Sequence, residues 1–174
     1  TLNAGMVAMD PTNGQIKAWV GGVNYKYFKY DHAGQAKRQV GSTFKPFVYA
    51  NSMRRGMHPC EEIPNVITCV EAGVGQKPWC PENSGGGYGD MVSLSDGLTN
   101  SMNTITAYQI KRFGTEAVVQ LAHKMGVVND IPNVPSIGLG TVELTVKEMC
   151  SSLSTFANQG VYIEPIFITH IEDK

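Results

Sequence analysis

A proline at position 46 constrains this 174-residue chain more than any other single residue. It lies in the segment 38–50, which reads RQVGSTFKPFVYA. Inside a helix a proline removes a backbone hydrogen bond, whereas in the first turn its missing N–H would have no intrahelical partner anyway. The apolar residues around it predict a helix over 42–55 that ends at Gly56. Ser42 is therefore expected at or next to the helix N-terminus.

The rest of the chain predicts an α+β fold in one domain over 1–174. Two short apolar runs flank the turn PTNG and predict a β-hairpin over 4–20. A helical pattern covers about 92–159, and a β-branched and aromatic run predicts one or two strands over 161–172. We therefore expect helices packed with an antiparallel sheet that is incomplete at the end of the chain.

Charge and hydropathy exclude several classes of partner. The net charge is −1 and the basic residues are scattered, so we expect no nucleic-acid partner. No apolar run approaches the roughly 18 residues that indicate a membrane span. The sequence lacks an initiator Met and runs directly into a strand pattern, so we expect a domain cut from a longer protein.

The cysteines do not predict a metal centre. Cys60, Cys69, Cys80 and Cys150 lack the spacing of a zinc site, and the four His are isolated from other ligand types. We expect no metal and no cofactor. Cys69 and Cys80 flank a turn-like segment, and they either form a disulfide in an oxidising compartment or remain free, buried thiols.

Ser42 and Lys45 have the spacing of an activated nucleophile. Residues at i and i+3 of a helix share a face, and the N-terminal dipole favours a developing negative charge. A serine hydroxyl needs an adjacent base, and a lysine can act as that base when burial lowers its pKa. One S-x-x-K match is about what chance gives in this composition, so a helix cap is the alternative for Ser42.

Ser101 and Asn103 form an S-x-N motif in a break between two predicted helices. This match is also no rarer than chance, and both residue types favour turns between helices. The S-x-N motif is informative only in combination with Ser42 and Lys45, because S-x-x-K and S-x-N belong to one set of catalytic motifs.

Longer segments around these motifs resemble the transpeptidase domain of class A penicillin-binding proteins. The family typically has R-Q-P-G-S-[ST]-F-K-P-F around its nucleophile. Four blocks match in the family's order: GMVAMDPTNGQIKAWVGG, QAKRQVGSTFKPFVYA, PWCPENSGGGYGDMVSLSDGLTNSMNTITAYQIKRFG and PSIGLGTVELTVKEMCSSLSTFANQGVYIEPIFITHIED. The resemblance implies the penicillin-binding and serine β-lactamase-like fold.

The resemblance also implies a serine-type D,D-transpeptidase that crosslinks peptidoglycan in cell-wall biogenesis and maintains cell shape. Ser42 would attack the penultimate D-Ala of a stem peptide, and Lys45 would accept its proton. Ser101 would relay the proton to the leaving amine, and Asn103 would bind the substrate backbone and hold Lys45. β-Lactam antibiotics would acylate Ser42, and its backbone N–H would supply half of an oxyanion hole.

Two positions depart from the family pattern. Val40 stands where a proline is usual, and we expect only a small effect. No K-[ST]-G motif occurs, although in the family it binds the substrate carboxylate and completes the oxyanion hole. We expect a chain truncated before that motif and poorly active by itself. Its unfinished sheet favours a homodimer or strand exchange.

Further expectations concern the parent protein and the alternatives. By resemblance, the parent carries a membrane anchor and a glycosyltransferase domain and works on the periplasmic side of the bacterial inner membrane. Trp79 and Asn83 match a loop that lines the family's cleft, although Trp79 serves equally as core packing. The alternatives are a β-lactam-hydrolysing relative and a non-catalytic, sensor-like module that binds peptidoglycan or β-lactams.

Overall fold

In a computed structural model that describes residues 2–173, the chain divides into two structural units. The first unit contains the described residues up to 38, together with 122–129 and those from 143 onward. The second unit contains 39–121 and 130–142. The helical region that the sequence predicts over about 92–159 is therefore split between the units. Its last helix, α5 (Val146–Ala157), packs against strand β1 (Met6–Met9) of the first unit.

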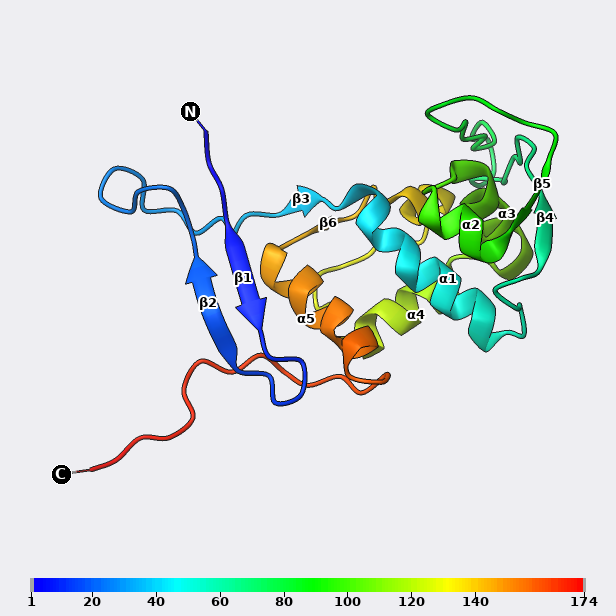
Figure 1. The fold of residues 1–174 in the computed structure, drawn as a ribbon. Coiled ribbons are helices and arrows are strands. Elements are labelled where there is room, and N and C mark those ends of the chain that lie inside the picture. The colour runs from blue at the N-terminus through cyan, green and yellow to red at the C-terminus, as the bar shows by residue number, and fades with distance from the viewer. Residues whose placement is uncertain (1, 174) are drawn as a thin grey trace. The chain divides into compact units, whose positions relative to one another are not determined.

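The first unit contains a β-hairpin within the predicted range 4–20. Strands β1 (Met6–Met9) and β2 (Ile16–Val20) pair antiparallel, as Figure 1 shows in blue. Met6 lies opposite Val20, and the register shifts once between Ala8 and Met9. The hairpin and α5 form the framework of this unit.

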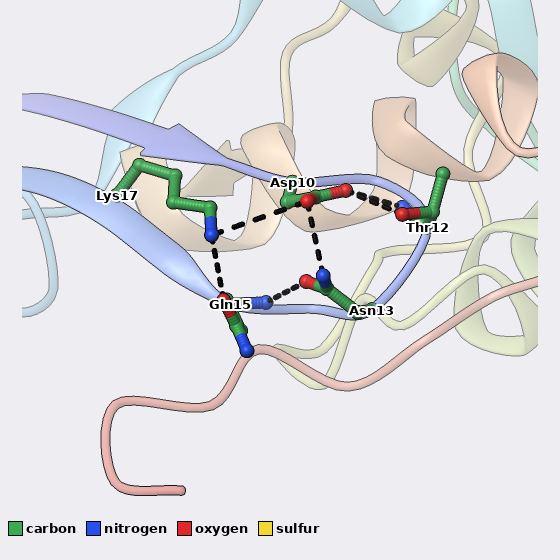
Figure 2. Close-up of polar contacts among 5 residues, drawn as sticks. All are labelled: Asp10, Thr12, Asn13, Gln15 and Lys17. Atoms are coloured by element: carbon green, nitrogen blue, oxygen red, sulfur yellow. Dashed lines mark hydrogen bonds and ion pairs between the residues drawn. The ribbon is translucent and has the colours of Figure 1, made fainter.

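Side chains within the turn fix the hairpin's tip (Figure 2). Asp10 Oδ1 accepts hydrogen bonds from the backbone N–H of Thr12 at 2.9 Å and from its hydroxyl at 2.6 Å. Asp10 Oδ2 accepts from Asn13 Nδ2 at 3.0 Å, and Lys17 Nζ lies 4.0 Å from the same oxygen. The Thr12 hydrogen bonds hold the pKa of Asp10 below its usual range.

Helix α5 begins with the capping box that the sequence TVKE predicts. The Thr145 hydroxyl accepts from the Glu148 backbone N–H at 3.1 Å, and Glu148 Oε2 accepts from the Thr145 backbone N–H at 3.0 Å. Two N–H groups that the helix cannot satisfy internally are thereby paired.

The strands predicted over 161–172 do not form in the described residues. Ile166 makes only an isolated bridge, in which Ile16 N donates to Ile166 O at 3.0 Å and Ile166 N donates to Gly14 O at 2.8 Å. Pro165 has no N–H with which to extend this ladder. A β-branched composition predicts a strand only where a partner is available to pair with it.

The second unit is mainly helical. A 3₁₀ turn and helix α1 follow each other directly, and α2 and α3 pack against α1 and each other (Figure 1). A short antiparallel ladder, β4 with β5, joins the ends of the loop that contains Cys69 and Cys80. The bounds are η1 (Gly41–Phe44), α1 (Lys45–Arg54), β4 (Glu62–Pro64), β5 (Met91–Ser93), α2 (Leu94–Thr99), α3 (Asn103–Phe113) and η2 (Pro135–Leu139).

Three further elements lie where the chain passes from one unit to the other along the sequence. They are β3 (Arg38–Gln39), β6 (Glu143–Leu144) and α4 (Glu116–Lys124). Among residues 2–173, no helix has the length and apolar character that crossing a membrane requires.

Apolar side chains of η1 and α1 form much of the core of the second unit. Phe44 and Phe47 are fully buried, with ring centroids 4.9 Å apart, and Ile105 of α3 is also fully buried. Burying side chains of this size stabilises a fold by about 1.5–3 kcal/mol each. This core anchors the helix that carries Lys45.

Candidate active site

Ser42 lies on the surface, one turn before α1. It is exposed within η1, and the Lys45 backbone N–H donates to its carbonyl oxygen. Pro46 occupies the first turn of α1, where its missing N–H leaves no helical hydrogen bond unmade. The helix therefore begins three residues later than predicted, because residues 41–44 form a tighter 3₁₀ turn. That turn keeps Ser42 and Lys45 on one face.

A close approach of two glycines holds the segment before Ser42. Gly41 N donates to Gly140 O at 3.0 Å, and Val40 N donates to Val142 O at 3.1 Å. Gly140 has φ +73°, in the left-handed region, and a Cβ on it would overlap the backbone carbonyl of Gly41. Only glycine at position 140 lets the two backbones meet this closely, and this contact fixes the backbone from which Ser42 projects.

Lys45 is buried beneath this surface, and the groups that hydrogen-bond its amine within residues 2–173 are all uncharged. Its side chain is 1% exposed. Nζ lies 2.5 Å from the Ser101 carbonyl oxygen, 3.0 Å from Ser101 Oγ and 2.8 Å from Asn103 Oδ1. None of the ion pairs found among residues 2–173 includes Lys45. The structure thus brings Lys45, Ser101 and Asn103 into one cluster.

Ser101 adopts a backbone conformation that explains its two contacts. Its φ is +53°, one of two positive values among the described non-glycine residues. Such a conformation costs about 1–3 kcal/mol outside glycine and is typical of functional sites. It breaks the chain between α2 and α3 and lets the carbonyl and the hydroxyl of Ser101 both reach Lys45 Nζ.

Burial lowers the pKa of Lys45 to about 8. The three contacts fit both protonation states of this amine. An ammonium donates three hydrogen bonds, which matches the three acceptors. A neutral amine donates two and has a lone pair, to which the rotatable Ser101 hydroxyl can donate. The cluster can therefore gain or release a proton near neutral pH without leaving a group unpaired.

The loop before α3 holds Asn103 in place, although the S-x-N motif gives no sign of this. Asn103 Nδ2 donates to the Glu82 carbonyl oxygen at 2.8 Å, and Asn103 N donates to Asn83 Oδ1 at 2.8 Å. Asn83 Nδ2 in turn donates to Asn65 Oδ1 at 2.9 Å. In the sequence, only the match of Asn83 to the W-x-P-x-N pattern points to these partners, and that pattern predicts a residue that lines the cleft.

The Ser42 hydroxyl makes no hydrogen bond to Lys45 in the part of the chain that is described, although the two residues share one turn.

Cys69 and Cys80 are joined as a disulfide, which spans the antiparallel bridge between Val70 and Trp79. Trp79 is half-buried, and its backbone pairs with Val70 at 2.8 and 2.9 Å.

The chain matches a family model described as penicillin binding protein transpeptidase domain, over residues 4–174. The chain belongs to this family of transpeptidase domains. The expected α+β fold of penicillin-binding proteins is thereby confirmed, and solved structures agree with it.

The curated relatives are much longer than this chain. Penicillin-binding protein 1A of Rickettsia felis is 31% identical over 99% of the chain, which covers 22% of that protein. The protein of the same name from Vibrio cholerae is 32% identical over 98% of the chain, covering 21% of the relative. The chain therefore spans about a fifth of the length of these relatives.

Solved structures show the same fold. The crystal structure of penicillin-binding protein 1A from Haemophilus influenzae superposes with a TM-score of 0.91 at 31% identity, covering 98% of this chain and 26% of that one. PonA1 from Mycobacterium tuberculosis gives 0.79 at 25% identity, covering 92% and 44%. Penicillin-binding protein A from the same organism, solved as a penicillin G acyl-enzyme complex, gives 0.74 at 19% identity, covering 92% and 47%, and supports the fold alone.

Proposed function

We propose that this chain carries the nucleophile half of a peptidoglycan D,D-transpeptidase site, with Ser42 as the residue that β-lactams acylate. The observation that carries this proposal is the buried Lys45 amine, whose partners are all neutral and whose pKa is lowered to about 8. A serine one turn away on the surface is the kind of group that such a base activates.

The proposed reaction starts with attack of Ser42 Oγ on the carbonyl carbon of the penultimate D-Ala. The proton of the hydroxyl passes to the neutral Lys45 amine, and the peptide C–N bond breaks. The departing D-Ala amine takes a proton relayed through Ser101, which already contacts Lys45 Nζ at 3.0 Å. An amine of a neighbouring stem peptide then takes the acyl group and frees Ser42.

Asn103 serves two purposes in this proposal. Its Oδ1 holds Lys45 at 2.8 Å, and its amide also hydrogen-bonds the substrate backbone. The 3₁₀ turn at Ser42 supplies a backbone N–H to the oxyanion. The sequence contains no K-[ST]-G triad to bind the substrate carboxylate, so residues 1–174 alone are a slow transpeptidase.

Labelling with a fluorescent penicillin tests this proposal. We expect covalent, long-lived labelling of the chain and none of the Ser42→Ala variant. Rapid loss of the label with release of hydrolysed antibiotic would favour a hydrolase. Equal labelling of Ser42→Ala would favour a module that binds without acylation. Crosslinking of peptidoglycan by residues 1–174 at the rate of an intact domain would contradict the proposed slow catalysis.

The disulfide supports an extracytoplasmic location. Disulfides persist in oxidising compartments, which include the bacterial periplasm. We therefore propose that the Cys69–Cys80 disulfide forms on the periplasmic side of the cell envelope, where peptidoglycan is crosslinked. Recovery of both thiols in the reduced form from envelope fractions would contradict this location. A membrane anchor and a glycosyltransferase domain in the same polypeptide remain part of the proposal.

Self-association is the remaining part of the proposal. The β1–β2 sheet has two strands, and apolar side chains after Ile166 are exposed, including Phe167 at 60% and Ile168 at 69%. Exposed apolar side chains beside an unpaired strand edge favour pairing with a second copy. Sedimentation equilibrium should show a dimer that Phe167→Lys weakens, whereas a monomer at all concentrations would contradict it.

A further inference from the structure

Helix α3 begins without a cap from its own N-cap residue. Met102 occupies the N-cap position, and its side chain makes no capping hydrogen bond. The first backbone N–H groups of a helix have no intrahelical acceptor and need another one. Asn83 Oδ1 accepts from two of them, Asn103 N at 2.8 Å and Thr104 N at 3.2 Å. A residue 20 positions earlier in the chain therefore caps this helix.

The same loop also orients the side chain of Asn103. The Glu82 carbonyl oxygen can only accept, so its 2.8 Å contact fixes which end of the Asn103 amide is Nδ2. The other end, Oδ1, then faces Lys45 Nζ at 2.8 Å. A reversed amide would place two donors against the Lys45 ammonium. Residues 82 and 83 together hold the backbone and the side chain of Asn103.

Asn83 is itself held rigidly. Its Nδ2 donates to Asn65 Oδ1 at 2.9 Å and to Thr104 Oγ1 at 3.2 Å. Asn65 is 4% exposed, and its own Nδ2 donates to the Gly87 carbonyl at 2.7 Å. Position 83 thus needs two acceptor directions and two donors on a short side chain, which only asparagine supplies.

We propose that Asn83 is a positioning residue for acylation, which acts through Asn103 to hold the Lys45 amine. This inference rests on the proposed function and extends it to a residue outside the S-x-x-K and S-x-N motifs. The competing explanation is that Asn83 only anchors the 65–90 loop to α3 and does not influence the position or protonation of Lys45.

Other titratable groups do not obscure a pH readout at Lys45. Tyr49, one turn further along α1, has its pKa raised to about 12 by burial and stays neutral. Glu82 contacts Asn103 only through its backbone carbonyl, and its side chain is exposed. Ser101 and Asn103, which contact Nζ directly, do not titrate in this range.

The test compares Asn83→Ala with Asn133→Ala. Asn133 lies in the same unit and accepts a hydrogen bond from Thr115, and neither residue is among the hydrogen-bond partners of Lys45 in the described chain, so its loss is a matched structural control. Two readouts are followed across pH: the ¹³Cε shift of Lys45, which reports its protonation, and the rate of penicillin attachment to Ser42. Asn83→Asp keeps an oxygen for the two helix N–H groups and acts as a partial rescue.

We expect Asn83→Ala to loosen the loop and let water reach the buried Lys45 amine, which moves its titration upward toward the ordinary lysine range, and to slow acylation about tenfold or more. Asn133→Ala should leave both readouts unchanged, and Asn83→Asp should acylate faster than Asn83→Ala. A folded Asn83→Ala variant with the wild-type titration and rate would overturn the inference. If wild type is not acylated at all, the proposed function fails, but the ¹³Cε titration still decides the role of Asn83.

Discussion

Lys45 Nζ lies 2.8 Å from Asn103 Oδ1, although 58 residues separate them in the chain. This contact joins the start of α1 to the start of α3 and leaves the amine among neutral partners. Because burial opposes the charged form, the fold lowers the pKa of Lys45 to about 8. The folded chain is therefore less stable at neutral pH than it would be with an ordinary lysine pKa, but its amine can act as a base.

The first prediction is that Lys45 makes stability depend on pH. Below about pH 8 the amine is protonated in both the folded and the unfolded chain, so it contributes no slope. Between that pH and the ordinary lysine range the unfolded chain binds more protons, so the free energy of unfolding rises with pH. The rise should be about 3 kcal/mol.

Denaturant unfolding of wild type and Lys45→Met across this range measures the effect. The difference between the two curves removes the contribution of every other titrating group. We expect the wild type to gain stability relative to Lys45→Met as the pH rises. Parallel curves would show that Lys45 has an ordinary pKa.

Gly140→Ala should weaken both the fold and acylation. A Cβ at this position would overlap the Gly41 backbone, and the residue also has φ +73°. The backbone that carries Ser42 must shift, at a cost of about 1–3 kcal/mol. Gly56→Ala is the matched control, because Gly56 has φ +96° but open space around its Cβ. If both variants acylate at the wild-type rate, the contact between Gly41 and Gly140 does not position the nucleophile.

Asn103→Asp should raise the pKa of Lys45 and slow acylation. A carboxylate against Lys45 Nζ favours the ammonium, while the substitution also removes the donor that Asn103 Nδ2 supplies to the Glu82 carbonyl. The same change removes the neutral amine, so acylation at pH 7 should fall about tenfold or more. Thermal unfolding and acylation rates are measured on the same samples. Faster acylation in Asn103→Asp would argue against Lys45 as the base.

Removing the Cys69–Cys80 disulfide should lower the free energy of unfolding, whereas removing the exposed thiol of Cys60 should leave it unchanged. The bridge closes a loop with a sequence separation of 11 residues, for which loop entropy gives about 3 kcal/mol. The double variant Cys69→Ser, Cys80→Ser should therefore unfold at lower denaturant concentration. Cys60→Ser, at an exposed free cysteine, is the control and should match wild type. Equal midpoints for all three proteins would contradict a stabilising role.

The sequence predicted local features well because their causes are local. Pro46 required a helix start, and the TVKE pattern produced the capping box at Thr145 and Glu148. The long-range features had no local signal. The contact of Gly41 with Gly140 and the cap that Asn83 gives to α3 both depend on residues brought together by the fold.

The strands expected over 161–172 show that local propensity alone does not predict a strand. Their β-branched and aromatic residues have the right propensity, but in the described chain Ile166 alone finds a bridge partner. Propensity describes how a residue fits a sheet, whereas the number of strands depends on which neighbours are present to pair.

The rate of penicillin attachment at Ser42, followed by mass spectrometry from about pH 6 to pH 10, tests the central claim most directly. The adduct should carry the whole antibiotic, because opening the lactam ring forms an ester at Ser42 without a leaving fragment. We predict a rate that rises with pH and reaches half its plateau near the Lys45 pKa of about 8. Lys45→Arg, which stays protonated, should be at least about 100-fold slower. An adduct on another residue, or an equal rate in Lys45→Arg at every pH, would contradict the assignment of Ser42 as nucleophile and Lys45 as its base.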